Sequence, residues 1–347
     1  MKKQEMNEKL LDEYTTLIDH RLEVFFDEVL EEAKDYHPFV YDVYLNIKEF
    51  VLRKGKRLAS TSTLLTYKGY TNDLDDKILN VGVGIELYRH SILAHDDLVD
   101  TDAMRRGGKA FHKIFDYDRR FGEGVAIFAG NIMYALSIRA LQNSGFQEDL
   151  TADILKLFAD DFQSVNESQI LDILFEFRIP DAEEWEIMAS KRAASLFNCT
   201  ILAGAILAKA PRQDLIKLKE ASSHIGYCFD IQDDIIGTFA AEEDYGREPK
   251  WDIIMGKKPL HTVFALEKAD EEDVEKLKKK GDLDLSEIEE IKEIIRKTKG
   301  LERAKEISRE HALNAINIIK KTKLSKETRE FFVEFIKFVS ESLGWYK

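Results

Sequence analysis

The sequence predicts an all-helical protein. Prolines and glycines, which usually mark turns, are few, with 5 and 18 in 347 residues. Leu, Ile, Lys, Glu and Ala recur at spacings of three and four almost throughout, which is the periodicity of amphipathic helices. No stretch has the alternating, β-branched pattern bounded by turn residues that a sheet requires. We therefore expect essentially no strand.

The clearest single element is a helix over Val81–Val99, a segment without proline. Its apolar side chains recur at helical intervals and would line one face of the helix. These positions are Val81, Ile85, Tyr88, Ile92 and Val99. The pattern predicts a long helix at this point of the chain.

Turn-forming residues divide the rest of the chain into further helices. Breaks are expected at 36–38, 69–76, 105–108, 143–147, 179–181, 211–214 and 237–259, and at Gly281 and Gly300. The segment 267–330 is a run of charged amphipathic helices, which is typical of a solvated outer face. No internal repeat or low-complexity linker interrupts the chain, so one helical domain over residues 1–347 is the simplest partition.

Composition and charge exclude several classes of protein. The formal net charge is -14, whereas a general nucleic-acid binder needs a basic face, so no nucleic-acid partner is expected. The first residues lack the apolar core of a secretory signal, and the apolar stretch 201–208 is shorter than the roughly 20 residues that cross a bilayer. Cys199 and Cys228 have no paired spacing that would suggest a disulfide or a metal site. We expect a cytoplasmic protein without a transmembrane segment.

The segment HDDLVD places Asp96, Asp97 and Asp100 inside an otherwise apolar helical pattern. Asp96 and Asp100 are one turn apart and project from the same face. Carboxylates so placed repel each other, and if they face a cavity a positive charge must compensate them. A hard divalent cation such as Mg²⁺ fits this arrangement, although one such triplet can also arise by chance.

A second acidic pair, Asp233 and Asp234, lies in FDIQDDIIG, again between apolar residues. Two such sites on opposite helices of a bundle could share one metal cluster.

Basic residues accompany both acidic sites. Arg105 and Arg106 follow the first one in MRRGG, where they could also simply complement a helix C-terminus before a glycine stop. Further upstream, four cations surround Gly55 in RKGKR. Carboxylate clusters combined with basic clusters indicate an anion that is carried with metal, namely a diphosphate.

With these motifs the sequence resembles the trans-isoprenyl diphosphate synthases, the family that includes farnesyl and geranylgeranyl diphosphate synthases. The match runs from about Gly55 to Lys257, and its pieces come in the family's order at the family's spacings. The resemblance implies a single-domain helical bundle of the isoprenoid synthase type with a central cavity. It also implies Mg²⁺ as cofactor and a homodimer.

The resemblance implies a role for each matching residue. Metal ions would be held by Asp96, Asp100 and Asp233, with Asp97 and Asp234 assisting. Isopentenyl diphosphate would be bound by Lys56 and Arg106. The allylic diphosphate would be bound by Arg105, Arg247 and Lys257. The residues that face the cavity beside the metals would be Gln169 and Asp172.

Two departures from the family pattern lie in the first half of the chain. Arg89 stands where the family usually has His or Gln, seven residues before Asp96, and arginine could still bind a diphosphate. Ala59 replaces an arginine that normally follows the glycine-lysine motif. Arg57 could reach the same oxygens.

Other departures lie near the second acidic motif. Arg192 and Ala193 replace a lysine-threonine pair, so either Arg192 or Lys191 would supply the charge. Asp230 replaces a glutamine before the motif, and Gly237 replaces its final aspartate. These changes predict a working but divergent synthase, with an altered second substrate as one consequence to consider.

The expected reaction is ionisation of an allylic diphosphate, followed by attack of the isopentenyl double bond on the resulting carbocation. Metal ions would stabilise the departing diphosphate, and an apolar cavity would exclude water. A class I terpene cyclase binds only one diphosphate, whereas Lys56, Arg89 and Arg106 favour two. A non-catalytic partner subunit of a two-component synthase is a further alternative, supported by the altered contacts and opposed by the retained aspartates. A di-iron bundle is disfavoured because no Glu-x-x-His pair occurs.

Product length in the family is limited by bulk just upstream of the first acidic motif. Ser91 and Ile92, five and four residues before Asp96, are not aromatic, so the floor of a short-chain enzyme is absent. Tyr88 lies about one turn, roughly 5 Å, deeper along the helix. This extra depth is similar to one isoprene unit, which predicts geranylgeranyl diphosphate as the product. Longer polyprenyl chains are the alternative if Tyr88 packs into an unrelated part of the core.

Overall fold

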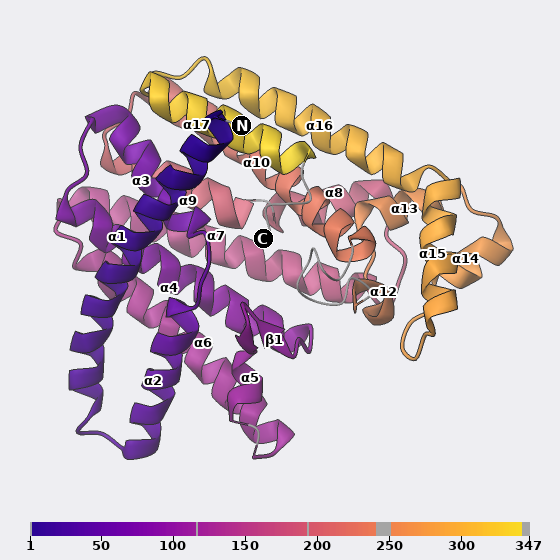
Figure 1. The fold of residues 1–347 in the computed structure, drawn as a ribbon, viewed down its shortest axis with the longest axis horizontal. Coiled ribbons are helices and arrows are strands. Elements are labelled where there is room, and N and C mark those ends of the chain that lie inside the picture. The colour runs from indigo at the N-terminus through magenta and orange to yellow at the C-terminus, as the bar shows by residue number, and fades with distance from the viewer. Residues whose placement is uncertain (1, 116, 193, 241–250, 342–347) are drawn as a thin grey trace. The chain divides into compact units, whose positions relative to one another are not determined.

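The computed structural model describes residues 2–115, 117–192, 194–240 and 251–341, and these are almost entirely helical (Figure 1). The all-helical prediction is confirmed. Contacts group the chain into two compact units, Met1–Leu157 with Thr200–Ala210 and Phe158–Cys199 with Pro211–Lys347. The boundary falls within helix α7 (Glu148–Phe175) and within helix α9 (Ala194–Leu207). The single domain over 1–347 stays a prediction.

The first unit contains all the elements that precede α7. These are α1 (Lys2–Ala33), α2 (Pro38–Leu52), α3 (Leu58–Thr71), α4 (Asp76–Val99), β1 (Met104–Arg105), β2 (Gly108–Lys109), α5 (Phe111–Ile114) and α6 (Arg119–Gln142). Helices α4 and α6 lie side by side and form the most extensive contact of this unit (Figure 1).

Helix α4 confirms the long helix predicted over Val81–Val99. Asp75 caps its N-terminus, because the Asp75 carboxylate accepts a hydrogen bond of 3.0 Å from the backbone N–H of Ile78. Most of its side chains are buried, on more than the single apolar face that the sequence pattern predicts, whereas Val99 of that face is 48% exposed. The helix ends at Val99, and Asp100 is its C-cap residue.

A small two-stranded hairpin follows α4, although essentially no strand was expected. Strand β1 pairs antiparallel with β2. Arg106 and Gly107 connect them with φ angles of 51° and 77°, and positive φ at both central residues is the pattern of a type I′ turn. Helix α4 ends at Val99, and Arg105 lies in strand β1. The alternative interpretation, in which Arg105 and Arg106 complement a helix C-terminus, is therefore wrong.

Helix α6 is the one helix of the described residues that is long and apolar enough to span a bilayer, with a mean hydropathy of 1.5 over its 18-residue window. Of that window, 44% is buried inside the protein. The core helix of a soluble protein can have the same length and composition, so this single helix does not contradict the expected absence of a transmembrane segment, which stays a prediction. The shorter apolar stretch 201–208 belongs to the core, since Ile201, Ala203 and Ala205 in α9 are fully buried.

The second unit contains the helices that follow α7, apart from the part of α9 that belongs to the first unit. These are α8 (Ala182–Arg192), α10 (Arg212–Phe239), α12 (Trp251–Met255), α13 (Leu260–Leu266), α14 (Glu271–Leu277), α15 (Leu285–Lys297), α16 (Gly300–Ile319) and α17 (Lys326–Glu341). Helices α10 and α16 lie side by side (Figure 1). Helix α15 begins with a capping box of Asp284 and Glu287 and buries one apolar face, as the amphipathic pattern of 267–330 predicts.

Candidate active site

The first acidic motif lies at the C-terminal end of α4. Asp96 and Asp97 belong to the last turn, and the backbone N–H of Asp100 donates a hydrogen bond of 2.8 Å to the Asp96 carbonyl. The Asp97 side chain is fully buried, whereas Asp96 and Asp100 are partly exposed. Asp96 and Asp100 are thus the accessible carboxylates of the motif.

Arg105 compensates the buried carboxylate of this motif. Its Nε donates a hydrogen bond of 2.6 Å to Asp97 Oδ1, and its Nη2 lies 3.2 Å from Asp102 Oδ2 and 3.9 Å from Asp96 Oδ2. Burial raises the pKa of Asp97 to about 6, although Arg105 opposes the shift. Burial works against the charge of Arg105, but the carboxylates of Asp97, Asp96 and Asp102 together outweigh it and raise the pKa of this arginine.

Arg106, at the tip of the hairpin turn, reaches back toward α4 with its guanidinium. Nη1 lies 2.9 Å from His90 Nε2, and a Cβ atom on Gly55 would come within 3.0 Å of its Cζ. Burial lowers the pKa of Arg106 to about 10, and the nearby charges of Arg57 and Arg89 add to the shift while Glu86 opposes it. The guanidinium is therefore still charged at neutral pH.

Arg89, also on α4, is half-buried and makes no hydrogen bond or ion pair within the part of the chain that the structure describes. Within the same residues, Arg106 has no carboxylate partner. Cations that are partly withdrawn from water and lack a paired carboxylate are suited to bind an anion. Lys56, half-buried in the loop between α2 and α3, lies next to Gly55 in the chain.

The structure does not support the prediction that Arg57 contacts the substrate. Its side chain is fully buried, with Nε 2.8 Å from Asp19 Oδ1 and Nη1 3.2 Å from Glu86 Oε2. Its backbone φ of 46° is left-handed, a conformation that costs a non-glycine residue about 1–2 kcal/mol. Arg57 holds α1, α3 and α4 together, and this burial leaves it no surface for a diphosphate.

Two residues of this region were not predicted. Arg53 holds the hairpin, because its Nη1 donates to the carbonyls of Arg105 at 3.1 Å and Lys109 at 2.8 Å. His90 contacts Arg106, as described above. Neither has a sequence signal that would find it, since Arg53 is one of several cations in RKGKR and a lone histidine in an apolar helix is more often a core residue.

In the second unit, Arg192 at the end of α8 gathers three aspartates. Its guanidinium nitrogens lie 3.0 Å from Asp234, 3.4 Å from Asp230 and 3.6 Å from Asp172. Burial raises the pKa of Asp234 to about 7, against the opposing charge of Arg192. Burial disfavours the charge of Arg192, yet the three aspartates hold its pKa well above the usual value.

Of the two cations proposed to replace the lysine-threonine pair, only Arg192 joins these aspartates. Lys191 is exposed and pairs with Glu167, so its predicted catalytic role is not supported. Lys257 lies 3.6 Å from Asp172, and Gln169 is half-buried one turn before Asp172 on α7.

Arg247 lies outside the described residues. Lys258, which was not predicted, is buried beside Lys257, and burial lowers its pKa to about 8.

The donor chemistry fits a hard divalent cation. Asp96, Asp100 and Asp233 offer oxygen ligands, and the buried Asp97 Oδ2 has no hydrogen-bond partner. Within the described ranges, no three His, Cys, Asp or Glu side chains gather closely enough to hold a metal by themselves. Mg²⁺ is usually held by one or two carboxylates together with substrate phosphates and water, so accessible carboxylates near cations that bind phosphate fit this ion. The metal-binding roles stay predictions.

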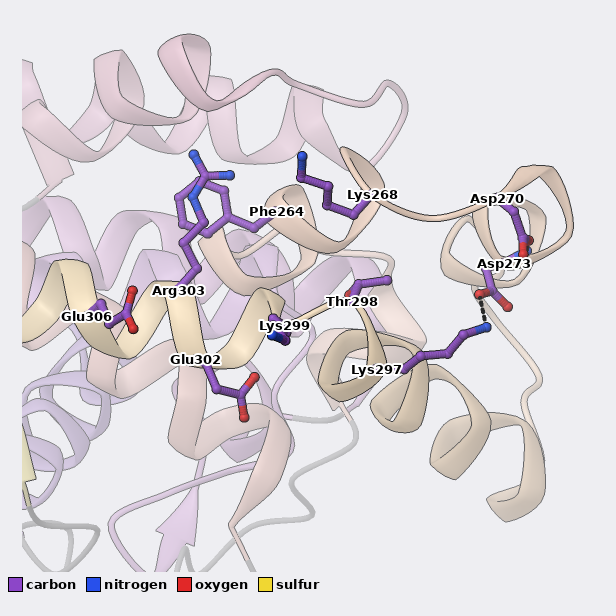
Figure 2. A pocket seen from close by; sticks show the side chains of 10 residues that line it. All are labelled: Phe264, Lys268, Asp270, Asp273, Lys297, Thr298, Lys299, Glu302, Arg303 and Glu306. Carbon is purple, nitrogen blue, oxygen red and sulfur yellow. Dashed lines mark hydrogen bonds and ion pairs between the residues drawn. The ribbon is translucent and has the colours of Figure 1, made fainter.

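A cavity of about 620 Å³ in the second unit contains none of the predicted site residues. Figure 2 shows its lining, which includes the cations Lys268, Lys297, Lys299 and Arg303 and the acids Asp270, Asp273, Glu302 and Glu306. Lys297 forms an ion pair of 2.9 Å with Asp273. Because these charges balance, the lining offers no net attraction to a diphosphate.

The residues proposed to limit product length lie within α4. Ser91 is fully buried, and its Oγ makes no hydrogen bond in the described structure. Tyr88 is also buried, and its ring lies 6.4 Å from that of Tyr134 on α6. Both positions remain proposals.

Comparison with known proteins agrees with the motifs. The polyprenyl synthetase family model matches residues 42–298. A short chain isoprenyl diphosphate synthase from Methanocaldococcus jannaschii is 31% identical over 267 residues, which is 76% of this chain and 79% of that one. A geranylgeranyl diphosphate synthase from Saccharolobus solfataricus is 28% identical over 80% of this chain and 84% of that one.

The fold is similar to the crystal structure of a geranylgeranyl pyrophosphate synthase from Corynebacterium glutamicum complexed with isoprenyl diphosphate and magnesium. The TM-score is 0.90 at 23% sequence identity, and the match covers 95% of this chain and 99% of that one. At this identity the likeness concerns the fold. The sequence matches and the motifs together show that this chain belongs to the polyprenyl synthetase family, that of the trans-isoprenyl diphosphate synthases.

Proposed function

We propose that this prenyltransferase joins isopentenyl diphosphate to an allylic diphosphate with Mg²⁺, and that geranylgeranyl diphosphate is its main product. One observation in the first unit carries the proposal. Helix α4 with its C-cap and the hairpin that follows carry the accessible Asp96 and Asp100 together with Arg89 and Arg106, two arginines that form no ion pair with a carboxylate of the described chain. Such a set can take both a metal-bound diphosphate and a second, directly bound one.

The residues of the chain then have distinct tasks. Mg²⁺ held by Asp96 and Asp100 would offset the charge that develops on the departing diphosphate, and Asp233 is the proposed metal ligand of the second acidic motif. Arg105, oriented by Asp97, supports the same diphosphate through charge. Arg89, Arg106 and Lys56 hold isopentenyl diphosphate. The reaction requires no nucleophilic side chain, so the protein acts by orienting the two substrates and by excluding water from the carbocation.

The homodimer is part of the same proposal, and the exposed face of α6 supports it. Phe128 is 69% exposed and Ile127 44% exposed, and both lie on a helix that is apolar enough to resemble a membrane span. A second copy would cover such a face in a self-complementary interface, which is the usual arrangement of symmetric dimers. We therefore take α6 as a dimer helix of a cytoplasmic enzyme. Phe128→Glu should shift the sedimentation of the protein toward monomer, and an unchanged mass would refute this role.

A product assay tests the activity. Purified protein is incubated with Mg²⁺, isopentenyl diphosphate and allylic starters of increasing length, and the products are analysed by mass. Geranylgeranyl diphosphate as the main product, and none in EDTA, is the expected result. Longer chains would favour a polyprenyl synthase. Condensation with none of the starters would refute the proposal and leave the non-catalytic partner subunit as the better interpretation.

A further inference from the structure

We infer that His90 is a positioning residue that orients the guanidinium of Arg106 for the diphosphate of the non-allylic substrate. The inference rests on the proposed function, in which Arg106 contacts isopentenyl diphosphate. His90 is 1% exposed on α4, so it acts through Arg106 and not by contact with substrate.

The two hydrogen bonds of His90 determine its tautomer. Nδ1 lies 2.7 Å from the carbonyl oxygen of Glu86, and because a carbonyl can only accept, Nδ1 carries the proton. Nε2 then has a lone pair, which accepts the hydrogen bond of 2.9 Å from Arg106 Nη1. Burial, followed by the charges of Arg106 and Arg57, holds the pKa of His90 well below its usual range. The ring is therefore neutral at neutral pH.

A neutral hydrogen-bond acceptor orients Arg106 without cancelling its charge, whereas a carboxylate would cancel part of it. Arg105 is oriented by Asp97 and Asp102, which also cancel much of its charge. Arg106 is oriented by an uncharged ring, so its positive charge remains available for an anion. The two adjacent arginines are thus held in different ways. Within the described residues Arg106 forms no ion pair with a carboxylate, and the charge of Glu86 acts on it only from further away.

Packing around the pair fixes this geometry. The rings of Phe50 and His90 pack in a T-shaped arrangement with 5.8 Å between their centroids. Gly55 leaves room for the guanidinium, since a Cβ atom there would lie 3.0 Å from Arg106 Cζ and Nη1. Arg106 itself lies at a hairpin turn, where part of the residue is exposed although its guanidinium is withdrawn from water. Without His90 its side chain would have to be ordered at the moment of binding, which weakens affinity.

Two variants at position 90 separate orientation from simple packing. His90→Phe keeps an aromatic ring and removes the acceptor, whereas His90→Gln places an amide oxygen near the position of Nε2. We expect His90→Phe to weaken binding of inorganic diphosphate about tenfold, measured by calorimetry in EDTA so that no metal contributes. We expect His90→Gln to stay within about twofold of the natural protein.

Steady-state kinetics provide a second readout. His90→Phe should raise KM for isopentenyl diphosphate and leave KM for the allylic starter within about twofold. Equal rises in both KM values would indicate a merely structural role and overturn the inference, as would a Gln variant as impaired as the Phe variant. Gly55→Ala, which displaces the guanidinium with His90 intact, should reproduce the selective effect if His90→Phe does not fold.

The failure of the proposed function would look different. If the natural protein makes no product with any starter, the proposed function fails, whereas the calorimetric series in EDTA still decides the role of His90. Metal-free diphosphate affinity that is equal in the natural protein and in a folded His90→Phe variant, or absent in the natural protein, would overturn the inference.

Discussion

The guanidinium of Arg192 lies 3.0 Å from the carboxylate of Asp234, the second aspartate of the second acidic motif. The same arginine contacts Asp230 and Asp172, so one cation compensates three carboxylates of α7 and α10. Arg192→Met should therefore leave these carboxylates without their main counter-charge and destabilise the protein by about 3–5 kcal/mol, as removal of one partner from a buried ion pair does. Lys191→Met is the matched control and should change stability by less than about 1 kcal/mol, because its pair with Glu167 is exposed. Urea unfolding of both variants tests this, and equal midpoints would contradict it.

Removal of a metal carboxylate should abolish most of the activity without unfolding the protein. Turnover should fall by about 100-fold or more in each of the variants Asp96→Ala, Asp100→Ala and Asp233→Ala. The reason is that the metal stabilises the charge of the leaving group in the transition state by several kcal/mol. Asp282→Ala, in an exposed loop, is the control. Near-normal turnover of Asp96→Ala, measured over a range of Mg²⁺ concentrations, would refute the metal assignment.

We predict that Arg89 binds the diphosphate of isopentenyl diphosphate, the non-allylic substrate. Arg89→Ala should raise KM for isopentenyl diphosphate by about 10- to 100-fold, since hydrogen bonds to charged groups contribute about 1.5–3 kcal/mol, and should affect KM for the starter less. Arg309→Ala, at an exposed position of α16, should change neither. A rise of the same size in both KM values for Arg89→Ala would contradict this placement.

Product length should respond to two positions of α4. Ser91→Phe should shorten the main product, because the ring would fill space that is deeply buried next to the motif. Tyr88→Ala should lengthen it, because it removes a buried ring one turn further along the helix. Mass analysis of products made from one common starter measures the chain length in each variant. If neither variant alters chain length, the limit of the pocket lies elsewhere.

Stability should depend on pH through Asp161, which lies in α7 away from the proposed metal ligands. Burial raises the pKa of Asp161 to about 6, although hydrogen bonds such as that from Asn198 at 3.1 Å oppose the shift. A carboxyl group whose folded pKa is raised contributes stability below its unfolded pKa of about 4, and this contribution is lost as the pH rises through about 6. The loss is at most about 3 kcal/mol. Asp161→Asn should therefore raise Tm relative to the natural protein more at pH 8 than at pH 5, and an equal gain at both would contradict the shift.

Local patterns in the sequence predict a large part of this fold, and the contacts between distant segments explain most of what they miss. The helix over Val81–Val99 and its acidic end are predictable because helical periodicity is local. The hairpin is not, because Arg106 precedes Gly107 where type I′ turns usually have Asn or Asp.

Arg57 and His90 illustrate the second limit. Arg57 meets Asp19 and Glu86, which are 38 and 29 residues away, and His90 meets Arg106, which is 16 residues away. A cation in a basic cluster has the same sequence pattern whether it faces solvent or an ion pair inside the protein. Only the tertiary packing decides between these roles, so the pattern alone assigned Arg57 to substrate and overlooked His90.

The glycines around the hairpin should differ in the substitutions that they tolerate, because different physical constraints act on them. Gly107 has a φ of 77° and nothing within 4 Å of its missing side chain, so its constraint is torsional and Asn is the replacement that a mutational scan should retain. Gly55 and Gly108 have no such backbone constraint, but a Cβ atom would meet Arg106 at 3.0 Å and Arg53 at 2.5 Å. At these two positions selection acts on volume, so a compensating change should appear in the neighbouring arginine and not in the backbone.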